Sequence, residues 1–394
     1  MKRKYWFIIC IFLSIGMVAC KKGSSPNKPE NSHPNHSKSI QIEKALLLDP
    51  LKVSQKKYDM QIFDTLITYV NAVPEGEDIY ISIYTFDYLP LIKALKDAYA
   101  KGVNIHLLID DNSTSAGTIE EFSGLLEAPS EIIKVDNDNQ PTAINHEKYI
   151  LFSELDLPQG IAKNVVLGTS HNFGLGAARK VNDAVVMTNK ELYGYFKNNW
   201  QEVASRAAFG MTNFTYTKNN VGDSISALFF PMRSGGKWTG NDPILETLNE
   251  LSDFDKDTIR LMMAFFTRLP VAQALTSLQN AGATVQVITR MADGQGVSDE
   301  VMAELKRLKL AGGYVKILDI SKQNLHSKCM LIKGTWKGHP TTLLLTGSHN
   351  YTNYALKYNN EFLLILKNSA LFKDYWSYYK QLQLTLNDYS GWGD

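Results

Sequence analysis

Cysteine is scarce in this sequence. Among 394 residues there are only three cysteines, Cys10, Cys20 and Cys329. The first two lie in an N-terminal export segment described below, which leaves only Cys329 for the folded part. We therefore expect no disulfide within the mature chain, and a fold held by one hydrophobic core or by two in parallel. Cys329 itself is expected to be buried as a small hydrophobic side chain.

A surplus of charge is also lacking. The formal net charge is +1, and removal of Lys2, Arg3 and Lys4 with the export segment changes it to +1 − 3 = −2. Enzymes that act on nucleic acid usually carry a basic surplus that matches the phosphate backbone. The composition therefore does not favour a nucleic-acid substrate, although a local basic groove is compatible with a neutral total.

The only long apolar run that stands out lies at the N-terminus. The stretch from Tyr5 to Val18 follows three basic residues and is too short to span a membrane comfortably, which is typical of an export signal. Met17-Val18-Ala19-Cys20 resembles a bacterial lipoprotein cleavage site, with Met where Leu is commonest. We expect a signal peptide over residues 1–19, a lipidated Cys20, and export to the periplasmic or extracellular face of a bacterial membrane. An ordinary secretory peptide or an uncleaved anchor is the alternative.

Residues 20–50 are predicted to form a flexible tether. The stretch from Lys21 to about Ser39 is rich in Ser, Pro, Asn and Lys, a composition that cannot build a hydrophobic core. The folded part is expected to begin at residue 51.

The rest of the chain is an internal duplication. His146-Glu147-Lys148 is matched by His326-Ser327-Lys328, with 326 − 146 = 180 residues between the two histidines. Each tripeptide is followed by a small-residue turn that ends in an asparagine, and then by an acid 11 residues further on. These residues are Asn172 and Asp183 in the first copy, and Asn350 and Glu361 in the second. Agreement at so many positions predicts two equivalent halves, over residues 51–215 and 216–394.

Each half is predicted to be an α/β domain. In the first half, a strand over residues 78–84 is followed by a helix over 91–101 and an apolar strand over 103–109. Strand, helix and strand at this spacing indicate a βαβ unit with parallel strands, and α/β sites usually form at the carboxyl ends of such strands. We therefore expect a mixed, largely parallel sheet flanked by helices in each half.

Two acids follow the second of these strands. Asp110 and Asp111 could hold a metal or act as a base, or they could cap the loop. Capping is favoured, because the second copy has Arg290-Met291 at the same place.

The repeated tripeptides point to phosphate chemistry. Residues two apart in a strand project from the same face of a sheet, so each histidine shares a face with its lysine. A nucleophile or base beside a fixed cation suits an anionic phosphate better than a neutral substrate, because the ammonium group can hold an anionic oxygen.

This pattern resembles the phospholipase D superfamily, whose mark is two His-x-Lys motifs, each followed by a Gly-Ser-x-Asn turn and an acid. The resemblance covers about residues 58–385. The second turn, residues 347–350, matches fully, whereas the first has Thr169 in place of the usual glycine. Both copies lack the aspartate that the family often places five residues after the lysine, where Ser153 and Lys333 stand. The resemblance implies two phospholipase D-like domains packed as a pseudo-twofold unit around one site, a monomer, and neither metal nor cofactor.

The resemblance also implies roles for the motif residues. One histidine attacks phosphorus and becomes a phosphohistidine, and the other protonates the leaving alkoxide; by analogy His146 is the nucleophile and His326 the general acid. The carboxylates of Asp183 and Glu361 would each accept a hydrogen bond from one imidazole. The remaining residues would bind phosphate oxygens (Lys148, Lys328, Asn172 and Asn350) or support the turns and donate to phosphate (Ser170 and Ser348).

The substrate is less determined than the chemistry. A phospholipid is the first hypothesis, because the expected lipid anchor places the domain at a membrane and the charge is not basic. An extracytoplasmic endonuclease is the second, transfer to an alcohol as in cardiolipin synthesis is the third, and an inactive binding module is the fourth. The segment from Phe229 to Trp238, which has no counterpart in the first copy, is either a loop over the site or an ordinary crossover.

Overall fold

The computed structural model describes residues 38–389 apart from 113, 136–142, 210–213 and 292–295. The expected signal peptide and the lipid site at Cys20 lie outside these residues. Within the described part of the chain, no helix is both long and apolar enough to cross a membrane.

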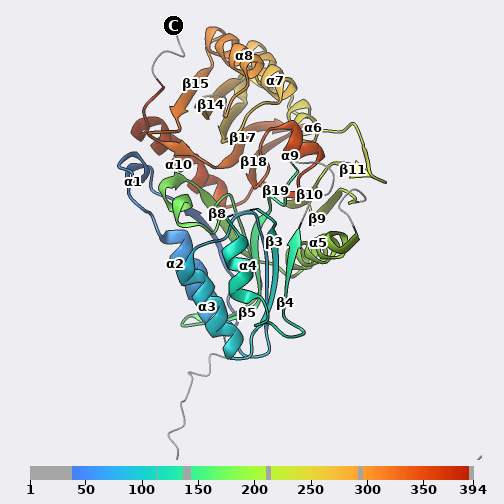
Figure 1. Cartoon of the computed structure of the whole chain (residues 1–394). Helices are drawn as coiled ribbons and strands as arrows, with labels where there is room; N and C mark the ends of the chain where they lie inside the picture. The colour runs from blue at the N-terminus through green and yellow to red at the C-terminus, as the bar shows by residue number, and fades with distance from the viewer. Residues whose placement is uncertain (1–37, 113, 136–142, 210–213, 292–295, 390–394) are drawn as a thin grey trace, which may run out of the picture. The chain divides into compact units, whose positions relative to one another are not determined.

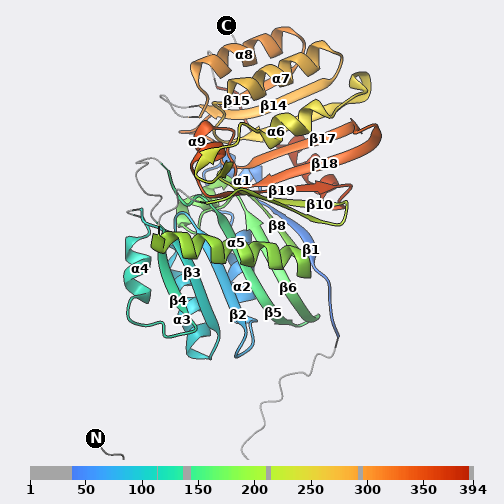
Figure 2. The ribbon, with the colours of Figure 1, turned by 90° about the vertical axis from the view of Figure 1, so that its right-hand side faces the viewer.

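The first half is built on a seven-stranded sheet with the order β1-β8-β6-β5-β2-β3-β4 (Figures 1 and 2). From one edge to the other its strands are β1 (Glu43–Leu47), β8 (Asp183–Thr188), β6 (Gly160–Thr169), β5 (Lys148–Leu157), β2 (Asp78–Ile83), β3 (Asn104–Asp110) and β4 (Glu131–Val135). Neighbours pair in parallel only among β2, β3 and β4, and all other pairs are antiparallel.

The second half repeats this plan in an eight-stranded sheet, with the order β15-β14-β13-β17-β18-β19-β10-β9. Its strands are β15 (Tyr314–Asp319), β14 (Thr284–Met291), β13 (Thr258–Met263), β17 (Lys328–Trp336), β18 (His339–Gly347), β19 (Glu361–Lys367), β10 (Ile225–Phe230) and β9 (Thr217–Val221). Here β13, β14 and β15 pair in parallel, and the other neighbours are antiparallel.

The predicted α/β class with mixed sheets is therefore confirmed, but the expectation of largely parallel pairing is wrong. Parallel neighbours need a long crossover connection. In the first half these connections contain α3 (Leu89–Ala100) and α4 (Ala116–Phe122), and in the second half they contain α7 (Leu269–Asn280) and α8 (Asp299–Leu310). By contrast, β5 and β6, and likewise β17 and β18, are joined by tight turns, which produce antiparallel pairs.

Helices cover the outer face of each sheet and also fill the space between the sheets. Outside the first sheet lie α2 (Gln61–Asn71), α3 and α4 (Ala116–Phe122), and outside the second lie α6 (Pro243–Asn249), α7 and α8 (Asp299–Leu310). Between the sheets lie α5 (Lys190–Phe209) and α10 (Leu371–Thr385), which close the first and second halves respectively. The short elements are α1 (Pro50–Ser54), α9 (Asn353–Lys357), η1 (Leu175–Arg179) and η3 (Phe254–Lys256).

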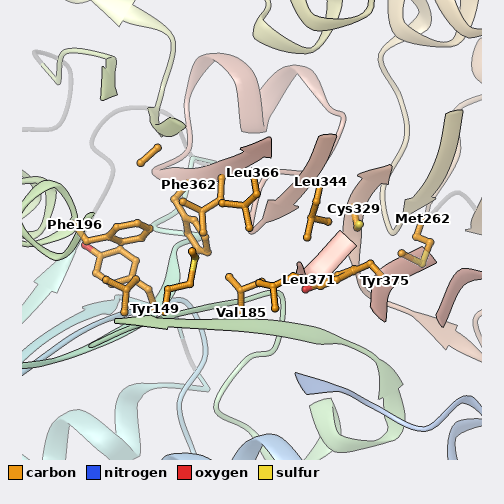
Figure 3. Packing of buried hydrophobic residues seen from close by; sticks show 14 of the residues in the cluster. Tyr149, Val185, Phe196, Met262, Cys329, Leu344, Phe362, Leu366, Leu371 and Tyr375 are labelled. Atoms are coloured by element: carbon orange, nitrogen blue, oxygen red, sulfur yellow. The ribbon is translucent and has the colours of Figure 1, made fainter. Parts of the chain in front are cut away.

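A shared hydrophobic core joins the two halves (Figure 3). Phe196 of α5 packs edge-to-face against Tyr149 of the first sheet and Phe362 of the second, with ring centroids 4.9 and 5.4 Å away. Tyr375 of α10 lies in the same cluster, as does Cys329, which is fully buried and unpaired as expected. This cluster draws on both sheets and joins the halves, and each half has in addition a core of its own between its sheet and its outer helices.

The fold begins earlier than the sequence predicts. Ser39 forms a β-bridge with Ile161, and β1 pairs antiparallel with β8 along the edge of the first sheet. The prediction of a tether up to residue 50 is therefore wrong from residue 39 onward. Leu46 and Leu48 explain the difference, because both side chains are buried and give this stretch apolar surface to pack.

Candidate active site

The two His-x-Lys motifs are held in place by backbone hydrogen bonds between the halves. The amide of His146 donates to the carbonyl of Asn360 at 2.9 Å, and the amide of His326 donates to the carbonyl of Val181 at 2.9 Å. Just before His326, β16 (Asn324–Leu325) pairs in parallel with β7 (Lys180–Val181) of the first half. Each motif is therefore fixed by the opposite half, and the site lies between the two.

His146 is oriented by a carboxylate from the second half. Its Nδ1 lies 2.8 Å from both Oε1 and Oε2 of Glu361, the first residue of β19. Glu361 is fully buried, and Asn359 also donates to it at 3.4 Å. Burial and the positive charge of Lys148 lower the pKa of His146 well below its usual range, which favours a neutral imidazole whose Nδ1–H points to Glu361.

His326 is oriented by neutral oxygens instead. Its Nδ1 lies 2.9 Å from Oδ1 of Asn182 and 3.0 Å from the carbonyl of Ser170. The expected hydrogen bond from this imidazole to Asp183 is not made, so that prediction is wrong. Successive side chains of an extended segment point to opposite faces, and here Asn182, the residue before the acid, faces the histidine.

Asp183 takes part in the core between the sheets. Its carboxyl accepts hydrogen bonds from Ser170 Oγ at 2.8 Å, from Thr346 Oγ1 at 2.6 Å and from the hydroxyl of Tyr375 at 2.9 Å. Thr346 and Tyr375 belong to the second half, so Asp183 joins the halves rather than aligning an imidazole.

Both lysines of the motifs are buried beneath the histidines. Nζ of Lys148 donates to the carbonyl of His146 at 2.6 Å, and Nζ of Lys328 donates to the carbonyl of His326 at 2.5 Å. Burial lowers the pKa of Lys148 to about 7, although Glu361 and Asp110 oppose this shift. Burial and the charge of Lys148 lower the pKa of Lys328 as well.

The asparagines of the two turns reach the site, whereas the serines and the turn histidines do not. Asn172 and Asn350 line the same cavity as His146 and His326. Ser170 binds Asp183, and Ser348 accepts from the amide of Phe362 at 3.0 Å, so both serines support their turns as expected. The rings of His171 and His349 are buried against Phe63 and Phe230, away from the cavity lining.

The cavity between the halves has a volume of about 810 Å³. Besides the two histidines and two asparagines, its lining includes two cations, Lys180 and Arg290, and three aromatic residues, Tyr84, Phe265 and Tyr354. No residue between Phe229 and Trp238 is among the lining residues: Phe229 and Phe230 lie in β10, and the rest contributes a small hairpin of β11 (Arg233–Ser234) and β12 (Lys237–Trp238).

The sequence did not reveal three residues of this site. Asn182 adjoins the predicted acid, Arg290 stands where the first copy has Asp110, and Lys180 belongs to no motif. Asp110 itself caps its loop as expected, because its carboxyl accepts from the amide of Asn145 at 2.7 Å and from Asn112 at 3.1 Å. The duplication gave one indication of Arg290, because this residue stands at the place of Asp110 and the two halves therefore differ there in charge.

Solved structures with a similar fold come from more than one class of enzyme. A phosphatidylserine synthase from Haemophilus influenzae superposes with a TM-score of 0.60 at 10% identity, over 89% of this chain and 90% of that one. A polyphosphate kinase from Porphyromonas gingivalis gives a TM-score of 0.56 at 13% identity, over 87% of this chain but 47% of that one, so this chain spans about half of the kinase. At such identities the likeness shows the fold alone. The sequence has no match among the curated proteins.

A family model provides closer evidence. The model described as "Cardiolipin synthase, PLD-like domain" matches the chain twice, at residues 71–204 and 250–383. The two matches follow the internal duplication and together cover more than half of the sequence. With one His-x-Lys motif in each match, the chain belongs to this family of phospholipase D-like domains and thereby to the phospholipase D superfamily.

Proposed function

We propose that the protein is a phosphodiesterase of phospholipase D type that acts on phospholipids through a covalent phosphohistidine. The observation that carries this proposal is the pair of histidines in one cavity, each with its Nδ1 engaged by the protein. In His146 the second nitrogen, Nε2, is left for chemistry at the substrate, and in His326 Nε2 lies 3.4 Å from Nζ of Lys328, which also lies 3.2 Å from Nδ1 of that ring.

The reaction proceeds in two steps, formation of the phosphohistidine and its hydrolysis. In the first, the lone pair of His146 Nε2 forms a bond to phosphorus while the bond to the leaving alcohol breaks, and His326 gives its Nε2 proton to the alkoxide. In the second, His326 takes a proton from water, the water oxygen bonds to phosphorus, and the P–N bond breaks. The anionic phosphate of the bound substrate favours the protonated form of His326 that the first step needs.

The different partners of the two histidines support this assignment of roles. Burial raises the pKa of Glu361 to about 8. Attack by His146 places positive charge on its ring, which favours the ionised form of Glu361, and the carboxylate then stabilises that charge through Nδ1. Asn182 offers His326 a neutral oxygen, which stabilises an imidazolium less and so makes His326 the readier proton donor. The asparagines of the turns supply amide donors to the phosphate. The buried lysines lie beneath the histidines, and a bound anionic phosphate favours their protonated, positively charged form.

The cavity lining supports a lipid rather than a nucleic acid. Sites that bind single strands track the backbone with a row of cations, whereas among the described lining residues only Lys180 and Arg290 are basic apart from the histidines. Tyr354 lines the cavity and is still 47% exposed, and Leu175, 40% exposed, lies between the lining residues Gly174 and Gly176. Such apolar side chains at the rim suit acyl chains, and a lipid anchor at Cys20 would hold the domain at its substrate.

Transfer of the phosphatidyl group to an alcohol is the second candidate function. It is supported by the description of the matching family model and by the fold shared with a phosphatidylserine synthase. Transfer differs from hydrolysis only in the second step, where an alcohol in place of water attacks the phosphohistidine.

One experiment separates these functions. The purified protein is incubated in EDTA with mixed phospholipid vesicles plus glycerol, and separately with plasmid DNA, alongside His146→Ala and His326→Ala. Phosphatidic acid formed only by the wild type would support the hydrolase, and a new glycerol-containing phospholipid would support the transferase. A nicked plasmid with intact lipid would show a nuclease and overturn the proposal. No product from either substrate, with a folded protein, would indicate an inactive binding module.

A further inference from the structure

The cavity has a cationic side, and that side adjoins His326. Arg290 lies near the end of β14, and Lys180 is the first residue of β7, whose parallel partner β16 leads directly into His326. All three residues line the cavity. Burial is the main cause of the lowered pKa of His326, and the positive charges of Lys328, Lys180 and Arg290 lower it further.

The described part of the protein does not neutralise these two cations. Arg290 donates its Nε to the carbonyl of Ala264 at 3.0 Å and another nitrogen to the amide oxygen of Asn324, and its guanidinium lies 4.3 Å from the ring centre of Phe265. Among the described residues, neither Arg290 nor Lys180 forms an ion pair with a carboxylate. Arg290 is only 4% exposed, and a buried cation without a counter-charge is costly, so an anion in the cavity would offset that cost.

The duplication separates these cations from the common phosphate machinery. The first-half counterpart of Arg290 is Asp110 (290 − 180 = 110), and the second-half counterpart of Lys180 is Tyr358 (180 + 178 = 358). The histidines, lysines and asparagines that serve the scissile phosphate occur in both copies, whereas the two cations occur in one place only. They therefore suit a charge that lies on one side of the scissile phosphate.

We infer that Lys180 and Arg290 form a subsite for a second anionic group, carried by the leaving alcohol of the phosphodiester. The inference rests on the proposed function: His326 protonates the leaving oxygen, so the cations beside His326 adjoin the headgroup. A headgroup that carries a phosphate or a carboxylate fits this subsite. The cationic headgroups choline and ethanolamine do not.

A binding measurement tests the subsite without turnover. Calorimetric titration with inorganic phosphate and with pyrophosphate should show that the wild type binds pyrophosphate about tenfold more tightly or better, because only the second phosphate reaches the cations. Lys180→Gln should remove this preference. Lys333→Gln, which removes an exposed lysine further along β17, should retain it. Equal affinity for the two anions in the wild type, or equal behaviour of the two variants, would overturn the inference. Arg290→Gln is a second test and should also remove the preference for pyrophosphate. Because Arg290 is buried, the thermal unfolding of this variant is measured in parallel to show that it is folded.

A turnover measurement identifies the anion and separates the two proposals. Vesicles that contain cardiolipin, phosphatidylserine, phosphatidylcholine or phosphatidylethanolamine are compared by kcat/KM. We expect cardiolipin or phosphatidylserine to exceed phosphatidylcholine by about tenfold or more, and Lys180→Gln to bring this ratio towards one. Preference for cardiolipin indicates a phosphate, and preference for phosphatidylserine a carboxylate. Equal or faster cleavage of phosphatidylcholine would overturn the subsite while supporting the phospholipase. Cleavage of plasmid DNA alone would overturn both.

Discussion

His146 and Glu361 are 215 residues apart in the chain, yet Nδ1 of the imidazole lies 2.8 Å from both oxygens of the carboxylate. The histidine comes from the first half and the acid from the second, so neither half has a complete site of its own. The duplication has thus produced one site from two equivalent motifs, and the two motifs are no longer equivalent in their partners.

Replacement of Glu361 by glutamine should impair catalysis more than folding. Glutamine retains the size of the side chain but not the charge that stabilises a cationic His146. We expect kcat to fall about 100-fold or more, with only a small change in the unfolding midpoint. Steady-state kinetics and urea unfolding of the same preparation measure the two effects. An unchanged kcat would show that Glu361 does not support the nucleophile.

Asp183→Asn is the matched variant in the first half, and the opposite result is expected. The carboxyl of Asp183 accepts from three hydroxyl groups in the shared core and does not contact a histidine. Asparagine has only one side-chain oxygen, and its NH2 group cannot accept a hydrogen bond, so at least one of the three bonds is lost and the free energy of unfolding should fall by about 1–3 kcal/mol. The folded protein should retain a kcat well above that of Glu361→Gln. If kcat instead falls as far as in that variant, Asp183 acts on an imidazole after all.

Asn182→Asp should shift the pH profile of the reaction. A carboxylate beside Nδ1 of His326 stabilises the imidazolium and therefore raises the pKa of this ring. The alkaline limb of kcat, where the general acid loses its proton, should move to higher pH by about one unit or more. A profile recorded from pH 5 to pH 10 for both proteins checks this. If only the acid limb shifted, His326 would be the nucleophile and not the general acid.

His171, one of the two buried turn histidines, should make the fold sensitive to acid. Burial lowers the pKa of His171 from 6.5 to about 3, although a hydrogen bond with the backbone of Asn172 opposes this shift. As the pH falls below 6.5, the unfolded chain binds a proton that the folded chain does not, so the free energy of unfolding decreases. Between pH 7 and pH 5 this residue alone should contribute a loss of about 2 kcal/mol.

His171→Phe is the variant that tests this contribution. Urea unfolding at pH 7 and pH 5 should show that the difference between the two pH values is smaller by about 2 kcal/mol than in the wild type. His339→Gln, at an exposed histidine, serves as the control and should leave the difference unchanged. An unchanged difference in His171→Phe would mean that the ring is already protonated, or solvated, in the folded state.

Much of the fold could be predicted because the chain contains the same plan twice. The βαβ units, the duplication and the burial of Cys329 follow from hydrophobic pattern and repeat spacing. The extent of antiparallel pairing could not be predicted as readily, because β5 and β6 are apolar runs whose direction depends on the turn between them. The edge strand β1 was missed because its short apolar stretch follows directly on a polar segment that has no core-forming residues.

The motifs predicted which residues gather at the site, but not how each is used. His146, His326, Asn172 and Asn350 line one cavity, as a shared site requires. The choice between Asn182 and Asp183 as the partner of His326 depends on a single step along the backbone, which spacing alone cannot resolve. Lys180 was also out of reach, since its place in the cavity depends on a short strand pair between the halves.

The measurement that tests the central claim most directly is the identification of the covalent intermediate. The wild type and His326→Ala are mixed with phospholipid vesicles, quenched and digested, and the peptides are analysed by mass spectrometry. The account predicts a phosphatidyl adduct on the peptide that contains His146, and predicts none in His146→Ala. An adduct on His326, or steady turnover by His146→Ala, would contradict it.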